Sequence, residues 1–339
     1  MRAAAIRTFA STAVITVVGL AVVGFAMGLS ALSVAIILVL VEIAFSFDNA
    51  IVNAKVLGRL SEFWQRMFLT VGAVIAIFGM RIVFPIFIVA LTAGLSWSEV
   101  VHLALHQPDM YAQKLEAAHL PIAAFGGGFL LVLALDFFVD PEQQVLWLTS
   151  FERSLKKLAQ HWAPPLITTA VLALASFVPA NHHHRQTFVA GMIGVAVYSA
   201  LHGLTEVLGR VQRGTKGRAL AGWAGFWLFV YLEILDSSFS FDSVIGAFAI
   251  SSQVVLIAIG LGIGALWVRS LTVFLVRTGT LAKYRYIEHG AHYTILALAF
   301  ILLLSIFYNV PEVITGLAGL GIIGSSLLAS HQALRDEAK

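Results

Sequence analysis

Long apolar runs dominate the sequence, and ten of them are long enough to cross a lipid bilayer as helices. A helical span needs about 20 apolar residues, and a backbone in lipid must satisfy its hydrogen bonds within helices or closed barrels. Of the 339 residues, 59% are apolar and only 12% are charged, and the mean hydropathy is +0.91. We therefore predict an all-α protein, a polytopic bundle of transmembrane helices.

We treat residues 1–339 as a single transmembrane domain with about ten spans. The expected spans cover residues 11–29, 31–54, 66–95, 121–140, 163–180, 186–209, 219–249, 253–276, 290–308 and 311–330.

The basic residues test this map, because cytoplasmic loops carry an excess of Lys and Arg. With the N-terminus inside, 17 of the 21 basic residues fall in cytoplasmic segments, and only Lys114 and Arg185 fall outside. Arg81 and Arg269 lie within spans. This split predicts a bacterial-type inner (plasma) membrane protein with both termini cytoplasmic. The net charge of +3 then indicates attraction to anionic membrane lipid, with no nucleic acid as partner.

Residues 1–29 have some features of a signal peptide, since Arg2 and Arg7 precede an apolar stretch. The stretch is long for a signal peptide and no small-x-small cleavage site follows it, so we expect it to be retained as a span. The chain has no cysteine, which excludes disulfides, thiolate metal sites and cysteine catalysis.

An acidic motif occurs twice inside apolar runs. The sequence EIAFSFDN at residues 42–49 returns as DSSFSFDS at residues 236–243. A charged side chain at the bilayer centre costs roughly 3 kcal/mol on insertion scales, so two acids repeated at the same spacing indicate a functional site. We interpret the two copies as halves of one cation pathway.

Each acidic span is followed by an apolar span that carries an arginine, Arg81 in the first case and Arg269 in the second. The acidic spans are five apart in our map, so the two copies would run in opposite directions through the bilayer. We therefore predict an inverted repeat, with residues 31–140 and 219–308 as its halves and the binding site at their interface.

Helical spacing places polar side chains on one stripe of each acidic span. The stripes consist of Glu42, Ser46, Asn49 and Asn53 on one span and Glu233, Asp236, Ser240 and Ser243 on the other. Asp48 and Asp242 lie about 120° from the first acids of their motifs, so they join the stripe at its edge or after local unwinding. No Gly or Pro inside the motif enforces such unwinding.

Carboxylate, amide and hydroxyl oxygens favour hard divalent ions, so Mn²⁺, Mg²⁺ or Ca²⁺ is the expected ligand. The buried arginines need partners, and the motif acids can supply them. Four motif carboxylates against two arginines leave two negative charges, which one divalent cation would neutralise; the carboxylates are Glu42, Asp48, Asp236 and Asp242. The alternative is that Asp48 with Arg81 and Asp242 with Arg269 are ion pairs that only fasten the bundle.

Several other polar groups are weaker candidates. They are His202 with Glu206 on the sixth span, Asp136 near the inner end of the fourth, and Glu288 with His292 at the start of the ninth. Glu288 and His292 are one turn apart, which suits a proton relay or inner gate as well as an interfacial anchor. The glycines at 126–128 and at 260, 262 and 264 indicate close helix contacts rather than a phosphate site. The segment from Ser96 to Leu120 is expected outside, either as a solvated loop or as a loop that gathers cations through His102, His106 and His119.

The motifs resemble the TerC family of integral membrane proteins, named for tellurium resistance. Glu-x5-Asp-Asn in one span, Arg in the next and Phe-Ser-Phe-Asp-Ser later carry the resemblance, which runs from about residue 31 to 330 and points to a longer branch of that family. The resemblance implies a metal-ion exporter with manganese as substrate. It makes Asp48, Asn49, Asp242 and Ser243 the core of the metal site, with Glu42 and Asp236 beside them. The segment from Glu288 to His292 and the outer loop depart from the shorter members.

We therefore expect efflux of a divalent cation, which exchange for protons could accompany. The alternative is a non-transporting membrane scaffold for a tellurium or metal stress-response complex. An intramembrane hydrolase lacks support, because neither Gly-x-Ser-x-Gly nor His-Glu-x-x-His occurs. We expect no enzyme activity and no prosthetic group, and we leave a homo-oligomer open.

Overall fold

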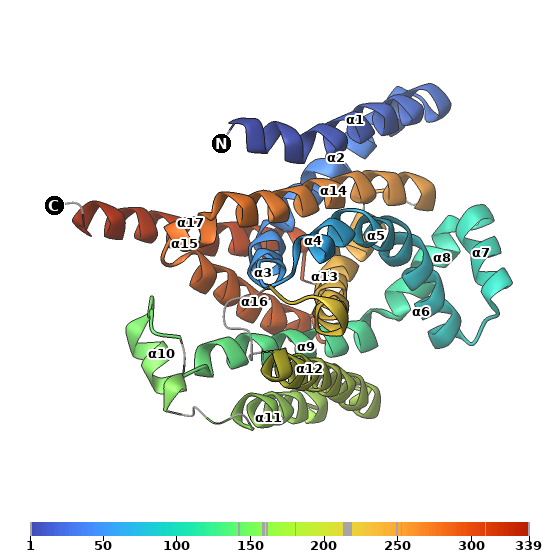
Figure 1. Ribbon diagram of the computed structural model, residues 1–339. Helices are drawn as coiled ribbons and strands as arrows, with labels where there is room; N and C mark the ends of the chain where they lie inside the picture. Colours follow the sequence, from blue (N-terminus) through green and yellow to red (C-terminus); the bar gives the residue numbers. More distant parts are fainter. Residues whose placement is uncertain are drawn as a thin grey trace. The chain divides into compact units, whose positions relative to one another are not determined.

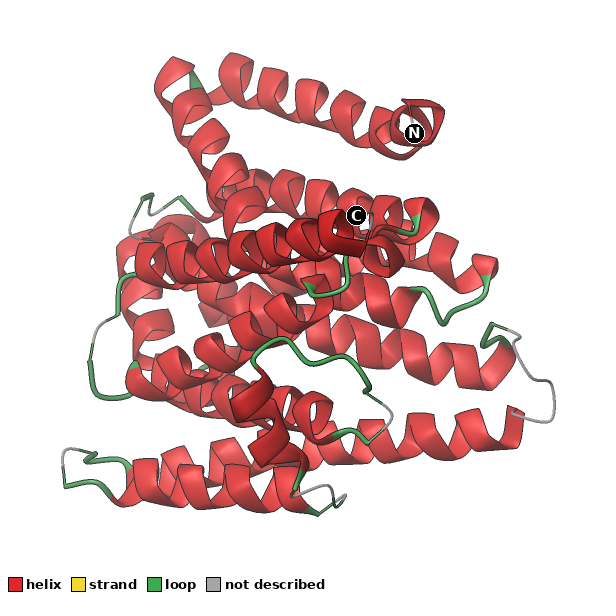
Figure 2. Cartoon of the chain, turned by 90° about the vertical axis from the view of Figure 1, so that its left-hand side faces the viewer, coloured by secondary structure: helices red, strands yellow, loops and turns green. Residues whose placement is uncertain are grey.

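The computed structural model describes residues 2–141, 143–157, 160, 162–179, 181–212, 219–248, 250–251, 253–308 and 310–337. In this part of the chain all regular structure is helical (Figure 2), apart from an isolated bridge between Leu60 and Leu220. The predicted all-α class is confirmed.

The chain divides into two compact units, residues 1–119 with 218–278 and residues 120–217 with 279–339. The first unit contains α1 (Arg2–Met27), α2 (Leu29–Phe45), α3 (Phe47–Leu57), α4 (Glu62–Leu69), α5 (Val71–Val74), the π-helix η1 (Ile75–Val83), α6 (Phe84–Ala93), α7 (Trp97–His106), α8 (Pro108–Ala117), α13 (Gly222–Phe248) and α14 (Val254–Thr278). The second contains α9 (His119–Val139), α10 (Thr149–Lys156), α11 (Ala163–Phe177), α12 (His184–Gln212), α15 (Thr280–Lys283), α16 (Ile287–Leu304) and α17 (Glu312–Glu337). Figure 1 labels the α-helices.

Among the described residues, seven helical stretches are long and apolar enough to cross a membrane. They are Thr8–Met27, Glu62–Ala93, His119–Val139, His184–Leu204, Val254–Thr278, Ile287–Leu304 and Ile314–Asp336. The bent pair Leu29–Ala44 and Phe47–Leu57 raises the count to eight if it forms one span. The protein is therefore a multi-pass membrane protein. The shorter apolar helix α11 and the acid-bearing α13 fall on the two remaining expected segments.

In the first unit, α14 packs against α1, α2, α3 and η1. Glycines on α14 make the approach to α2 close, because a Cβ added at Gly260 would collide with Leu38 and one at Gly264 would collide with Glu42. The expected role of this glycine run in helix contact is thus confirmed. The first α14–α2 contact lies one turn from the second, so the two helices stay in contact up to the acidic motif.

The second unit uses the other glycine run in the same way. Gly127 of α9 faces Leu303 of α16, and Gly128 lies against the backbone of Gly191 on α12. Helices α11 and α12 pair with each other, as do α16 and α17. The glycines therefore replace side-chain bulk where backbones meet, which is how helices associate in lipid without a hydrophobic driving force.

The segment expected as a solvated outer loop is helical, which corrects that expectation. It forms α7 and α8, separated by Gln107. A capping box begins α7, since the Ser96 hydroxyl accepts from the Glu99 N–H and the Ser96 N–H donates to the Glu99 carboxylate at 2.7 Å. Hydrogen bonds from the Ser96 hydroxyl and N–H hold the pKa of Glu99 below its usual value. Hydropathy alone does not predict α7 and α8, because both helices are amphipathic and neither is an apolar run.

The orientation of the chain can be tested by thiol labelling, since no native cysteine interferes. Single cysteines at Ser98 and His183, both exposed, should react with an impermeant reagent added to intact cells, because both lie in segments expected outside. A cysteine at the exposed Ser154 of α10 should react only after permeabilisation. Labelling of the Ser154 position in intact cells, without labelling of the other two, would invert the topology.

Candidate cation site

The first acidic motif lies at a break between two helices. Helix α2 ends at Phe45, Ser46 has φ −104° and ψ 17°, and α3 starts at Phe47 with its axis turned by 53°. The second motif lies within α13, whose backbone is helical from Gly222 to Phe248. Local unwinding therefore occurs in the first copy only. It places Asp48 and Asn49 in the first turn of a new helix, where the positive end of the helix dipole favours acids.

Arg81 makes a buried ion pair with the first acid of the first motif. Its guanidinium donates to Glu42 Oε1 and, at 3.1 Å, to the backbone oxygen of Ala76. Both charged side chains are almost fully buried. Arg81 belongs to η1, and π-helical turns are rare and occur often at functional sites.

Arg269 makes buried ion pairs with two acids of α13, which carries the second acidic motif. Its two terminal nitrogens donate to both oxygens of Glu233, at 2.9 and 2.8 Å, and one of them also donates to Asp236 at 2.6 Å. The guanidinium lies over the ring of Phe68, 4.2 Å from its centroid, and donates to the backbone oxygen of that residue. The other Asp236 oxygen accepts from the Asn53 amide at 2.9 Å, which links α13 to α3.

These pairs correct the assignment of Asp48 to Arg81. Arg81 reaches Glu42, because Glu42 lies on α2 before the bend while Asp48 lies beyond it on α3. The side chain of Asp242 is outside the described residues, and Arg269 pairs with Glu233 and Asp236.

Two glycines are required where the ion pairs form. A Cβ at Gly72 would collide with the Arg269 guanidinium and the Glu233 carboxylate. A Cβ at Gly264 would lie within 3 Å of the Glu42 side chain. The sequence alone does not identify either glycine as part of the site.

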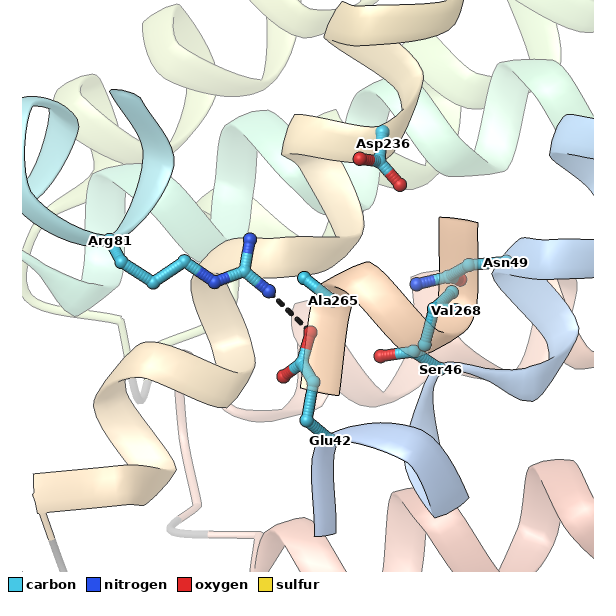
Figure 3. A pocket seen from close by; sticks show the side chains of 7 residues that line it. All are labelled: Glu42, Ser46, Asn49, Arg81, Asp236, Ala265 and Val268. Carbon is cyan, nitrogen blue, oxygen red and sulfur yellow. Dashed lines mark hydrogen bonds and ion pairs between the residues drawn. The ribbon is translucent and has the colours of Figure 1, made fainter. Parts of the chain in front are cut away.

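A small cavity lies beside these ion pairs, with room for about one water molecule. It is lined by Glu42, Ser46, Asn49, Arg81, Asp236, Ala265 and Val268 (Figure 3). Within the described residues, three buried oxygens in this region have no hydrogen-bond partner: Glu42 Oε2, Asn49 Oδ1 and Asn53 Oδ1. Two buried donors of the same ion pairs, Arg81 Nε and Arg269 Nε, also lack a partner. Buried polar groups are nearly always satisfied in proteins, so this concentration of unpaired groups marks the region as a candidate binding site.

The predicted metal ligands are brought together only in part. Glu42, Asn49 and Asp236 line the cavity, and Ser243 is buried beside Glu42. Asp48 is buried but does not line it. In the described part of the chain, no three His, Asp or Glu side chains gather closely enough to hold a metal ion. A cation here would therefore depend on amide and hydroxyl oxygens as well as carboxylates.

The weaker candidates Asp136 and His202 do meet, inside the second unit. The Tyr198 hydroxyl donates to Asp136 at 2.7 Å, and His202 Nδ1 lies 3.4 Å from the same carboxylate oxygen. Tyr198 was not among the predicted site residues, although it lies one turn before His202. The side chain of Glu206 is outside the described residues.

Glu288 and His292, predicted as a proton relay, an inner gate or an interfacial anchor, lie one turn apart on α16. His292 Nδ1 contacts the backbone oxygen of Glu288 at 2.8 Å, and its ring stacks on Phe137. The neighbouring His289 instead lies 3.6 Å from Glu152, a fully buried acid of α10. Glu152 accepts from two backbone N–H groups and from Tyr293. Sequence reasoning missed Glu152, because it lies in a charged segment that reads as a cytoplasmic loop.

The double pairing of Arg269 predicts a large cost for its removal. Arg269→Met leaves two buried carboxylates without their cation and should lower the free energy of unfolding by about 3–5 kcal/mol. Arg277→Met, on the same helix but exposed and hydrogen-bonded to the Thr8 hydroxyl, should cost less than about 1 kcal/mol. Unfolding of both purified variants in mixed micelles measures the difference, and equal costs would contradict a structural role for the Arg269 pairs.

The family described as “Protein of unknown function (DUF475)” matches residues 47–337, which include α3, α13, α14 and both arginines of the site. No curated protein and no solved structure matches the chain. Because the match covers most of the sequence, the chain belongs to the DUF475 family.

Proposed function

We propose that the protein is a membrane transporter for a divalent metal cation, with Mn²⁺ as the expected substrate. The observation that carries this proposal is the group of three buried acceptor oxygens without partners beside a cavity of one-water size. An unsatisfied buried acceptor costs about 1–3 kcal/mol. A protein that keeps three of them in one place gains from a ligand that supplies positive charge.

The chemistry of the donors favours a hard ion. Glu42 offers one free carboxylate oxygen, Asn49 and Asn53 offer amide oxygens, and the Ser46 hydroxyl lines the same cavity. Oxygen donors suit Mn²⁺, Mg²⁺ and Ca²⁺, whereas imidazole and thiolate donors, which select zinc and copper, do not line it.

The charge of the region supports a divalent ion. Three carboxylates pair with the two guanidiniums, those of Glu42, Glu233 and Asp236. Asp48 is buried next to Asn49 in the chain, and with all six groups ionised the formal charge is −2. A single divalent cation balances that charge. Uncompensated charge in a membrane is costly, so an ion of this valence would also stabilise the closed site.

The arrangement of the arginines supports an inverted repeat across ten spans. In each half, the first acid of the motif pairs with the arginine of the following span, Glu42 with Arg81 and Asp236 with Arg269. A helix broken at the motif resembles the discontinuous helices that form ion sites in transporters. The break occurs in one copy only, so the two halves would differ in role.

The resemblance to the TerC family supports export of manganese across a bacterial-type inner membrane. Asp48, Asn49, Asp242 and Ser243 would be the ligands that this resemblance assigns. Direction, coupling to protons and the ten-span topology with cytoplasmic termini belong to the same proposal. A scaffold that binds no metal would leave the three unpartnered oxygens unexplained.

Replacing one cavity oxygen separates a ligand role from a structural role. Asn49→Leu removes a buried acceptor without changing the charge, so the metal-free protein should be as stable as the wild type or more stable. Mn²⁺ binding should weaken about tenfold or more, and transport into proteoliposomes should be lost. Ser237→Ala, a polar change on α13 at a residue that does not line the cavity, should leave binding unchanged. Loss of stability with normal binding would show that Asn49 is structural.

Removing a cavity arginine should act in the opposite direction. Arg81→Gln makes the site more negative and should tighten Mn²⁺ binding about tenfold, since charges close together in a protein interact by a few kcal/mol. Tighter binding slows release, so transport should fall. Arg66→Gln, an exposed change on α4, should affect neither quantity. Calorimetry on the purified variants decides the matter, and unchanged or weaker binding in Arg81→Gln would contradict a shared electrostatic site.

A further inference from the structure

Helix α7 exposes two histidines that no part of the proposed cation site uses. His102 and His106 are one turn apart, both are exposed, and their rings lie parallel with centroids 4.3 Å apart. The opposite face of the helix carries Val100 and Ala104, which are buried. The two histidines therefore lie on the exposed face of a helix whose opposite face is packed against the protein.

A capping box and packing against neighbouring helices hold α7, which carries the two histidines, in place. The capping box formed by Ser96 and Glu99 fixes the start of α7, and α7 packs against α6 and α8 (Figure 1). A rigid helix lowers the entropic cost of bringing two side chains to one ligand. The histidines thus need only side-chain rotation to share a ligand.

One nitrogen of the second ring is already engaged. His106 Nδ1 lies 3.2 Å from the backbone oxygen of His102, which leaves Nε2 for a ligand. Two histidines at i and i+4 on one helical face are the arrangement with which helices hold zinc. From the stacked position, each ring must turn about its Cβ–Cγ bond to direct a nitrogen to a common point.

We propose that His102 and His106 together bind one late first-row transition-metal ion of the Zn²⁺, Ni²⁺ or Cu²⁺ class. Imidazole nitrogen favours these ions over the hard ions that suit the oxygens of the cavity. Among the described residues, no third His, Asp or Glu groups with the pair, so water would complete the coordination and the ion would exchange readily. The site is independent of the proposed transport function.

The test uses full-length protein without a purification tag, with Cu²⁺ followed by electron paramagnetic resonance and Zn²⁺ by calorimetry. Wild type should show a Cu²⁺ signal with two equatorial nitrogens. His102→Ala and His106→Ala should each weaken the Zn²⁺ site at least tenfold, and the double variant should be little worse than either. This non-additive pattern is the signature of a chelate. Alanine favours helix, so α7 should remain folded.

Two controls address the other histidines of the chain. The combined change His106→Ala with Gln107→His keeps the number of histidines but moves one off the shared face, and it should behave like His106→Ala. His331→Ala removes an exposed histidine of α17 with no histidine one turn away, and it should change nothing. Unchanged Zn²⁺ affinity in the double variant, or losses that simply add, would overturn the proposal.

Discussion

Two arginines buried in apolar helices determine how the first unit is arranged. A guanidinium stays charged at any relevant pH, so each must find carboxylates within the membrane. Arg269 holds both Glu233 and Asp236, and Arg81 holds Glu42. These contacts join α13 to α14 and α2 to η1. The acids exceed the arginines in number, and this excess leaves charge available for a cation.

The ion pairs also explain why buried oxygens in this region lack hydrogen-bond partners. Glu42 uses one oxygen for Arg81 and lies beside the Ser46 and Ser243 hydroxyls. Asn53 uses its amide nitrogen for Asp236, and its side-chain oxygen has no hydrogen-bond partner. The bend at Ser46 brings Asn49 to the same cavity. Gly264 lets the backbone of α14 approach the Glu42 side chain closely. A cation would therefore enter a cavity whose oxygen ligands are already in place.

Much of the fold follows from hydropathy, because each expected apolar segment falls on a helix. The repeated motif and the two arginine spans also identify the helices that line the cavity. The partners of the arginines could not be predicted, since helical spacing does not say which neighbouring helix a side chain faces. The break at Ser46 carries no Gly or Pro signal. The role of Glu233 with Arg269 and the burial of Glu152 depend on contacts between distant segments.

The central claim is that a divalent cation occupies the cavity beside Glu42 and Asn49. Anomalous diffraction at the manganese edge, from crystals of the purified protein grown with Mn²⁺, locates the ion directly. The account predicts one strong peak within bonding distance of Glu42 Oε2 and the Asn49 side-chain oxygen. A peak confined to surface carboxylates, or an empty cavity at saturating Mn²⁺, would contradict it.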